Sequence, residues 1–170
     1  MKIGILSDTH DDLDNLQLAL DLFAREKVTT LLHCGDVCGP AVVEALQGFS
    51  VTFAQGNMDR MPALGMAIEA LHGPGRLAVF HRLLLDGFQV ALAHGHDEAL
   101  IDYSLYSGEY AYIFCGHTHR RADRRVGSTR LINPGAMGGG GRHEQRSICI
   151  VDFQTQEARF LDVIPRRRRG

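Results

Sequence analysis

The sequence predicts an α/β fold in which two mixed sheets face each other and helices cover the outside. Up to residue 54, short apolar runs alternate with segments of helical periodicity, which is typical of βαβ units and a parallel sheet. After residue 75 the chain is rich in strands joined by tight turns, which favours a second, largely antiparallel sheet. With 170 residues, we expect one domain over 1–165 and a basic tail at 166–170.

The first half is expected to hold two helices between three strands. A helix beginning near Asp12 is predicted by apolar residues spaced three and four apart on one face, namely Leu13, Leu16, Leu20 and Phe23. Pro40 suits the first turn of a second helix, which Gly48 would end. The short apolar runs between these segments predict buried strands at 2–6, 28–33 and 51–54.

The second half reads as hairpins around one further helix. Apolar runs at 77–85 and 88–93 flank Asp86-Gly87, a favoured two-residue turn. A helix over 97–107 leads to a strand at 110–115, and further hairpins are expected at 122–133 and 146–163. The segment 60–75 is left unassigned because it contains Pro62, Gly65 and Pro74, and a mobile loop is expected at 138–141.

Five short clusters of acidic, amide and histidine side chains follow the expected strands. In chain order they are Asp8-Thr-His10, Gly35-Asp36, Gly56-Asn57-Met58-Asp59, His94-Gly-His96 and Gly116-His117-Thr-His119. Strand ends share one rim of a sheet, so these distant residues can converge. Two carboxylates, an amide oxygen and at least four imidazoles are about the supply that two divalent cations need, with positions left for water and substrate.

The donor types indicate how such cations would be held. Asp36 is the expected bridge between the two ions, because the preceding glycine lets the chain turn sharply. Asp8 and His10 would serve one ion and Asn57 the other, with His94, His117 and His119 completing the shells. Oxygen and nitrogen donors without thiolate favour Mn, Fe, Ni, Co or Zn over Mg or Ca. They do not distinguish within that group, and manganese is our first expectation.

This order of motifs resembles the calcineurin-like metallophosphoesterase superfamily, in particular its small bacterial and archaeal phosphodiesterase branch. The resemblance extends from Lys2 to about Gly135 and includes Ile132-Asn133-Pro134-Gly135. It implies a four-layer α/β/β/α sandwich, in agreement with the two-sheet reading. It also implies that one metal binds Asp8, His10, Asp36 and His119, and that the other binds Asp36, Asn57, His94 and His117.

One position departs from the superfamily pattern. Many members carry a histidine where this chain has Met58, and that histidine is credited with protonating the leaving group. A thioether has no proton to give, and a general acid contributes about 10²- to 10⁴-fold to a rate. The small phosphodiesterase branch commonly lacks that histidine, and resemblance to it implies phosphodiesterase activity in preference to monoesterase activity, with nucleotides and cyclic nucleotides among the small diesters to consider.

The resemblance leads to a mechanistic hypothesis, in which a hydroxide bridging the two ions attacks phosphorus in line. Asn57 and the ions would stabilise charge on the phosphoryl oxygens. His96 is assigned either proton delivery in place of residue 58 or, as the favoured reading, support of the ligands. Asp59 would orient nearby ligands. His33, His72, His81 and His143 match no motif and are expected to be ordinary surface or packed histidines.

Two other function classes compete with the enzyme. The retromer scaffold subunit of eukaryotes resembles this chain but serves as a protein-interaction platform. That scaffold has lost part of the ligand set, whereas all seven positions here hold a competent ligand, which favours the enzyme. A nuclease would use the arginine-rich second half as a groove and would bind nucleic acid in a salt-sensitive way, and it is also less favoured than the phosphodiesterase.

The charge and composition of the chain indicate its expected partners and location. The net charge of −2 divides into −9 for residues 1–110 and +7 for residues 111–170, so the second half can attract an anionic substrate. We read the arginines at 166–169 as a solvated terminus, and nucleic acid is not an expected partner. Without a signal peptide or an apolar run of roughly 20 residues, a cytoplasmic protein is expected, with no membrane partner. The resemblance makes a homodimer or homotetramer plausible.

Overall fold

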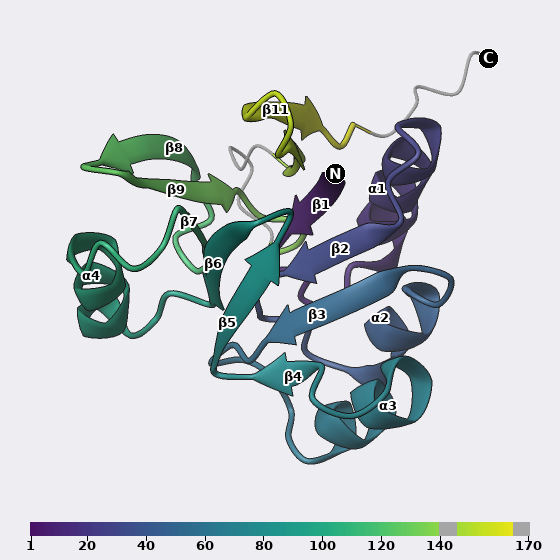
Figure 1. The fold of residues 1–170 in the computed structure, drawn as a ribbon. Coiled ribbons are helices and arrows are strands. Elements are labelled where there is room, and N and C mark those ends of the chain that lie inside the picture. The colour runs from purple at the N-terminus through teal and green to yellow at the C-terminus, as the bar shows by residue number, and fades with distance from the viewer. Residues whose placement is uncertain (140–145, 165–170) are drawn as a thin grey trace.

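The computed structural model describes residues 1–139 and 146–164. The mobile loop expected at 138–141 lies partly outside these residues, and the basic tail expected at 166–170 lies wholly outside them. In the described part, the chain forms two sheets that lie between helices (Figure 1).

The first sheet has six strands among the described residues, in the order β11-β10-β1-β2-β3-β4. The four strands from β1 to β4 run parallel, whereas β10 is antiparallel to both β1 and β11. Their bounds are β1 Lys2–Leu6, β2 Thr30–His33, β3 Ser50–Ala54, β4 Leu77–Ala78, β10 Ser147–Asp152 and β11 Glu157–Asp162.

The second sheet has five strands in the described residues, in the order β5-β6-β7-β9-β8. Hairpins join β5 to β6 and β8 to β9, and the central pairs β6–β7 and β7–β9 are parallel. Their bounds are β5 Phe80–Leu85, β6 Phe88–Ala93, β7 Tyr112–Phe114, β8 Arg121–Val126 and β9 Thr129–Pro134.

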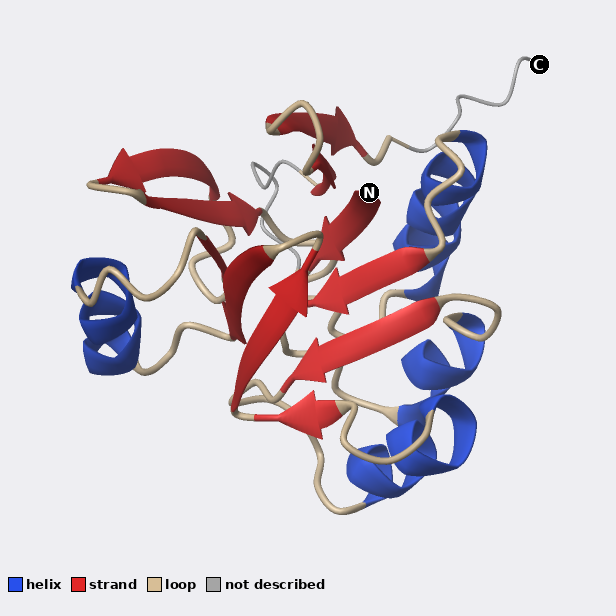
Figure 2. Cartoon of the chain, in the orientation of Figure 1, coloured by secondary structure: helices blue, strands red, loops and turns tan. Residues whose placement is uncertain are grey.

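Helices form the outer layers (Figure 2). The first sheet is covered by α1 (Leu13–Arg25), α2 (Pro40–Ala45) and α3 (Ala63–His72), and the second by α4 (Glu98–Tyr106). Asp12 caps α1 by accepting the Asn15 N–H, and Asp97 caps α4 by accepting the Leu100 N–H. No helix of the described residues is long and apolar enough to cross a membrane.

The alternation of side chains along β1 shows how the layers fit together. Ile3 and Ile5 are fully buried between the two sheets, whereas Leu6 is buried on the helical side. Gly4 also faces α1, and a Cβ there would lie 2.4 Å from the ring of Phe23. The helix therefore lies directly on the strand, and the predicted four-layer sandwich is confirmed.

Two predictions of the second half were wrong. The apolar run at 77–85 is not one strand: it breaks at the half-exposed Val79, so that β4 joins the first sheet and β5 the second. The second half is also less antiparallel than expected, because α4 carries the chain from β6 to a parallel β7. The hairpin predicted at 146–163 does form, but it extends the first sheet through β10 and β11.

The unassigned segment 60–75 contains α3, with Pro62 as its N-cap and Gly73 as its C-cap. Of the residues that argued against a helix, Pro62 and Pro74 lie at its two ends, whereas Gly65 lies within it. Helix α2 is shorter than expected and ends at Ala45, before Gly48.

Candidate metal centre

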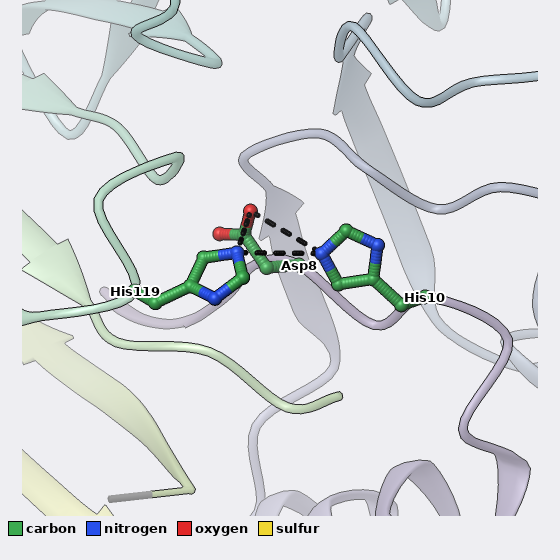
Figure 3. Close-up of side chains that lie close together, drawn as sticks. All are labelled: Asp8, His10 and His119. Carbon is green, nitrogen blue, oxygen red and sulfur yellow. Dashed lines mark hydrogen bonds and ion pairs between the residues drawn. The ribbon is translucent and has the colours of Figure 1, made fainter. Parts of the chain in front are cut away.

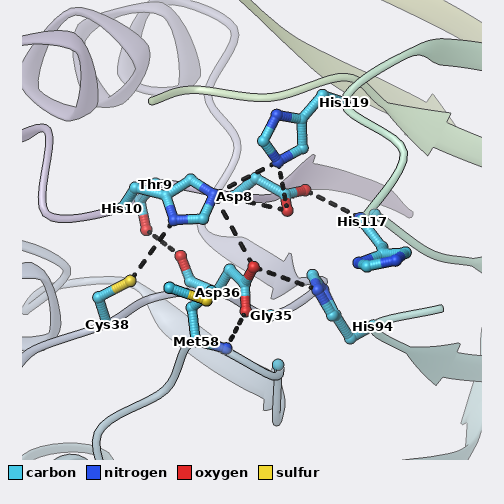
Figure 4. Close-up of polar contacts among 12 residues, drawn as sticks. Asp8, Thr9, His10, Gly35, Asp36, Cys38, Met58, His94, His117 and His119 are labelled. Atoms are coloured by element: carbon cyan, nitrogen blue, oxygen red, sulfur yellow. Dashed lines mark hydrogen bonds and ion pairs between the residues drawn. The ribbon is translucent and has the colours of Figure 1, made fainter. Parts of the chain in front are cut away.

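The seven predicted ligands come from loops that follow the carboxyl ends of five strands. The loops after β1, β2 and β3 belong to the first sheet, and those after β6 and β7 belong to the second. Because the strands within each of these groups are parallel, their ends meet at one rim. Figure 4 shows polar side chains from both sheets directed toward a common centre.

One group of potential ligands consists of Asp8, His10 and His119 (Figure 3). The Nε2 atom of His119 lies 3.2 Å from Asp8 Oδ1 and 3.3 Å from His10 Nε2. His10 Nε2 lies 3.9 Å from the same carboxylate oxygen. One carboxylate oxygen and two imidazole nitrogens therefore face a shared point, which suits a divalent transition metal.

The second group consists of Asp8, Asp36 and His94. Asp36 Oδ2 lies 3.3 Å from His94 Nε2, and Asn57 Oδ1 lies 3.1 Å from that nitrogen. The potential ligand atoms of each group lie within 4.8 Å of one another.

The two carboxylates lie between the histidines of both groups. Asp8 is a member of each group, and Asp36 Oδ2 also lies 3.8 Å from His10 Nε2. Both aspartates are thus placed to bridge two cations. The bridging role of Asp36 stays a prediction, and Asp8 is a second candidate for it.

His117 and His96 lie at the outer side of this centre. The His117 ring is 5.1 Å from the His94 ring, and its backbone N–H donates to Asp8 Oδ2 at 3.1 Å. His96 is exposed, with its ring 5.5 Å from that of His94 and 6.3 Å from that of His117. His96 therefore lies next to His94 and His117 but belongs to neither of the two ligand groups.

Asp59 contacts the backbone and not the other carboxylates. It accepts the Cys38 N–H at 2.8 Å and the Gly56 N–H at 2.6 Å, and so ties the loop after β2 to the loop after β3. This arrangement suits the predicted orienting role, because those loops carry Asp36 and Asn57.

The backbone at the predicted ligands is strained. Five of the seven have positive φ: Asp8 at 53°, His10 at 47°, Asp36 at 55°, His117 at 65° and His119 at 57°. A non-glycine residue in this region costs about 1–3 kcal/mol and persists only where its surroundings enforce it. Strain of this kind is concentrated at functional sites, and here it falls on the metal-ligand candidates.

Two motif glycines are required by close packing at the centre. A Cβ at Gly56 would lie 2.1 Å from Asp36 Oδ1 and 2.3 Å from Asp36 N. A Cβ at Gly116 would lie 1.8 Å from Ser7 Oγ and 2.6 Å from Asp8 Oδ2. These are closer than any side chain allows, so the carboxylates can hold their positions only beside glycine.

The buried carboxylate of Asp8 provides a test of whether a cation fits. Its side chain is fully buried, and its Oδ1 accepts no hydrogen bond from any described residue. Burial raises the pKa of Asp8 above its ordinary value, because a charged carboxylate is poorly solvated there. A divalent cation would satisfy this oxygen and offset that cost. The donors therefore fit a metal.

The second carboxylate has the opposite shift. Burial acts to raise the pKa of Asp36, but hydrogen bonds from His94 and from the Met58 N–H outweigh it, so the pKa is lowered. For His94, burial acts to lower the pKa, but contacts with Asp36 and Asp8 outweigh it, so the pKa is raised. Asp36 is accordingly held as the anion that a metal ligand must be.

The proton on His94 is fixed by its surroundings. Its Nδ1 lies 2.8 Å from the Cys34 carbonyl oxygen, which can only accept, so Nδ1 carries a hydrogen and donates it. Nε2 faces the acceptor oxygens of Asp36 and Asn57, so without a metal it also carries a hydrogen and donates it to Asp36. A bound cation would take the place of that hydrogen. Fixing the outer nitrogen on a carbonyl is the usual way in which proteins orient a metal-binding histidine.

His33, which matches no sequence motif, is a buried residue that supports the metal-ligand candidates. It is fully buried, and its Nδ1 accepts the Gly35 N–H at 3.2 Å while its Nε2 lies 3.1 Å from Thr9 Oγ1. The Thr9 hydroxyl in turn lies 3.3 Å from the Asp36 carbonyl oxygen. His33 therefore joins the loop of Asp8 and His10 to the loop of Asp36. Its place at the end of a strand that leads into Gly35-Asp36 is the only signal that the sequence offers.

His33 should make stability depend on pH. Burial lowers its pKa from 6.5 to about 3, so between these values the unfolded chain binds a proton that the folded chain does not. Stability must therefore fall as the pH drops through this range. Between pH 7 and about pH 4.5, we expect the metal-free wild type to lose about 2 kcal/mol more stability than His33→Gln. Urea unfolding at both pH values measures this difference, and equal losses would contradict it.

Comparison with known proteins shows the family to which the chain belongs. The family model of the calcineurin-like phosphoesterase superfamily domain matches residues 1–156. Phosphodiesterase MJ0936 of Methanocaldococcus jannaschii is 32% identical over 138 residues, which cover 79% of this chain and 83% of that protein. The solved structure of a novel archaeal phosphodiesterase matches with a TM-score of 0.88 and 30% identity, covering 95% of this chain and 99% of that chain.

More distant structures share the fold. The phosphoesterase Yfce of E. coli matches with a TM-score of 0.69 at 23% identity, covering 96% of this chain and 100% of that chain. Vps29 of Entamoeba histolytica, complexed with Zn²⁺, matches with a TM-score of 0.70 at 19% identity and the same coverage. The resemblance predicted from the motifs is confirmed, and the chain belongs to the calcineurin-like phosphoesterase superfamily.

Proposed function

We propose that the protein is a phosphodiesterase that hydrolyses a small diester with two divalent metal ions, manganese being the first expectation. The single observation that carries this proposal is the pair of adjacent ligand groups that share Asp8. The relatives that are named phosphodiesterases support the same reaction class. When bound, two such cations activate water as a nucleophile and offset charge on phosphoryl oxygens.

The chain's own residues divide into two sets of proposed ligands. Asp36 is retained in both, and the fully buried Asp8 adds the second negative charge. One set is Asp8, His10, Asp36 and His119, and the other is Asp36, Asn57, His94 and His117. Asn57 is exposed with its Oδ1 near His94, so its amide group is open to a phosphoryl oxygen.

Proton delivery to the leaving group is the weak step in this site. The Met58 side chain is 55% exposed and has no proton to donate, while its backbone N–H is engaged with Asp36 Oδ1. His96 is exposed, its ring lies 5.5 Å from that of His94, and it is not one of the proposed ligands, so we retain it as proton donor or support. Diesters with acidic leaving groups, which need little protonation, are therefore the proposed substrates.

A reconstitution experiment tests the proposed function. Protein stripped with a chelator should be inactive toward bis(4-nitrophenyl) phosphate, and added Mn²⁺ or Ni²⁺ should restore turnover. Protein that stays inert with either metal would favour the interaction scaffold over the enzyme. Turnover that survives complete metal removal would contradict the metal-dependent reaction.

Installing a histidine at position 58 should widen the substrate range. We expect Met58→His to raise hydrolysis of 4-nitrophenyl phosphate about 10²-fold or more, because an imidazole can protonate the leaving oxygen. The measurement is kcat/KM for this monoester beside that for bis(4-nitrophenyl) phosphate, with Met58→Gln as a control that is polar but cannot serve as an acid. An equal gain in both variants, or none in either, would show that residue 58 does not limit protonation.

A further inference from the structure

A cavity of about 420 Å³ adjoins the metal centre on the side of α4. Its lining residues come from α4, from the β8–β9 hairpin and from the loop between Cys115 and Thr118. His117 belongs to both places: it lines the cavity, and its ring lies 5.1 Å from that of His94. A substituent on a phosphate at the metal centre would therefore reach the cavity by passing His117.

Regular secondary structure builds the two long walls. Ala122 pairs with Asn133 and Arg124 with Leu131, so these four side chains share one face of the hairpin. The opposite wall is one face of α4, whose lining residues follow helical spacing: Glu98, Ile101 and Asp102. Ile101 and Leu131 give the cavity an apolar floor.

The wall next to the metal centre is fixed by a buried amide. Asn133 is 2% exposed, and its Nδ2 donates to the Gly116 carbonyl at 2.6 Å and to Thr118 Oγ1 at 3.1 Å. Its Oδ1 accepts the Gly135 N–H at 2.9 Å. The loop that carries His117 is thus held in place from the cavity side, and the cavity is a preformed site.

Three charged side chains in this cavity are available to a ligand. Glu98, Asp102 and Arg124 line it, and within residues 1–139 and 146–164 their side chains make no hydrogen bond or ion pair. On the same hairpin, by contrast, Arg130 and Asp123 are paired at 2.7 Å. Glu98 lies in the first turn of α4, where an acidic side chain stabilises the helix through its dipole. Asp102 lies beyond that turn, so the helix dipole does not account for its charge.

We propose that this cavity binds a ribonucleoside substituent of the diester, which makes ribonucleotide diesters the preferred substrates. This inference rests on the proposed phosphodiesterase function. A base fits the apolar floor and can stack on the planar guanidinium of Arg124. The Asp102 carboxylate can accept hydrogen bonds from ribose hydroxyls, as acidic residues do in nucleotide sites. The volume lies in the range of small-molecule pockets, about 300–1,000 Å³.

Two substrates that differ by one hydroxyl group test this inference. Uridine 5′-(4-nitrophenyl phosphate) and its 2′-deoxy analogue release the same 4-nitrophenolate, so only recognition of the sugar differs. With Mn²⁺-loaded wild type, we expect about a tenfold higher kcat/KM for the ribose form, mainly through KM. Asp102→Asn should remove this preference, so that the ribose and deoxyribose forms give equal kcat/KM values.

Glu109→Gln is the matched control, because it also removes one carboxylate charge near α4 but does not line the cavity. It should keep the ribose preference. Equal turnover of the ribose and deoxyribose forms by the wild type would overturn the inference. The inference would also be overturned if 4-nitrophenyl phosphocholine were hydrolysed faster than the uridine diester and this preference depended on Asp102. The cavity would then select a cationic substituent.

Direct binding separates this inference from the proposed function. Saturation-transfer NMR should show that uridine binds to the metal-free protein. Asp102→Asn should lower the affinity for uridine about tenfold, and Glu109→Gln should leave it unchanged. If bis(4-nitrophenyl) phosphate is not hydrolysed but uridine binds in this way, the reaction assignment fails and the cavity assignment stands. If uridine does not bind at millimolar concentration, the cavity assignment fails whatever the activity.

Discussion

Replacing Asp36 with asparagine is expected to lower turnover of bis(4-nitrophenyl) phosphate about a thousandfold. Asparagine keeps the shape and can still accept the Met58 N–H, but it removes the negative charge that lies 3.3 Å from His94 Nε2 and 3.8 Å from His10 Nε2. Loss of this charge should also lower the metal content after dialysis. Metal analysis and kcat/KM on the same sample measure both effects.

A surface aspartate supplies the control for Asp36. Asp86 pairs with the N-terminal amine at 2.7 Å on an exposed part of the chain, so Asp86→Asn should change neither metal content nor turnover. Asp36→Asn protein that keeps two metal equivalents and turnover within about tenfold of the wild type would show that Asp36 does not hold the ions.

Replacing Gly56 with alanine is expected to have the largest effect on stability, about 3 kcal/mol. The new Cβ would lie 2.3 Å from the Asp36 backbone nitrogen, which cannot rotate away as a side chain can. The two loops must separate, and the Asp36 carboxylate must move with them. Urea unfolding and metal titration of the purified variant measure these two consequences.

Gly108→Ala is the matched control for Gly56. Gly108 has a φ of 72° with no atom within 4 Å of an added Cβ, so alanine there costs only the backbone preference, about 1–2 kcal/mol. It should bind metal like the wild type. If Gly56→Ala is as stable as the wild type and binds metal equally well, the close packing beside Asp36 is not what fixes the carboxylate.

Local sequence signals predicted most elements of the fold because each arises within one element. Asp12 marks the start of α1 as predicted, and Leu16, Leu20 and Phe23 lie on its buried face, whereas Leu13 is 44% exposed. Local signals do not divide the run at 77–85 correctly, because β4 and β5 have the same apolar character. Only their pairing with other strands assigns them to different sheets. The α3 segment was not predicted because proline and glycine are read as helix breakers, although here the prolines lie at the helix ends and Gly65 is accommodated within the helix.

The site shows the same division between local and tertiary information. The ligand candidates carry their own chemistry, so their order and their places after strands were enough to predict that they meet. His33 has no such signal, since its role depends on a threonine 24 positions away. The sequence also gives no signal for Asp102, because its place in the cavity depends on the packing of α4 opposite the β8–β9 hairpin. The choice of Asp36 over Asp8 as the bridge also depends on distances that spacing cannot supply.

Anomalous diffraction from crystals soaked in Mn²⁺ tests the central claim most directly, namely that seven side chains surround two adjacent cations. We expect two anomalous peaks about 3.5–4 Å apart, with Asp8 and Asp36 beside them and imidazoles on either side. A map with no peak between these carboxylates at saturating Mn²⁺ would contradict the claim. So would a single peak at Asp8, His10 and His119 with Asn57, His94 and His117 left uncoordinated.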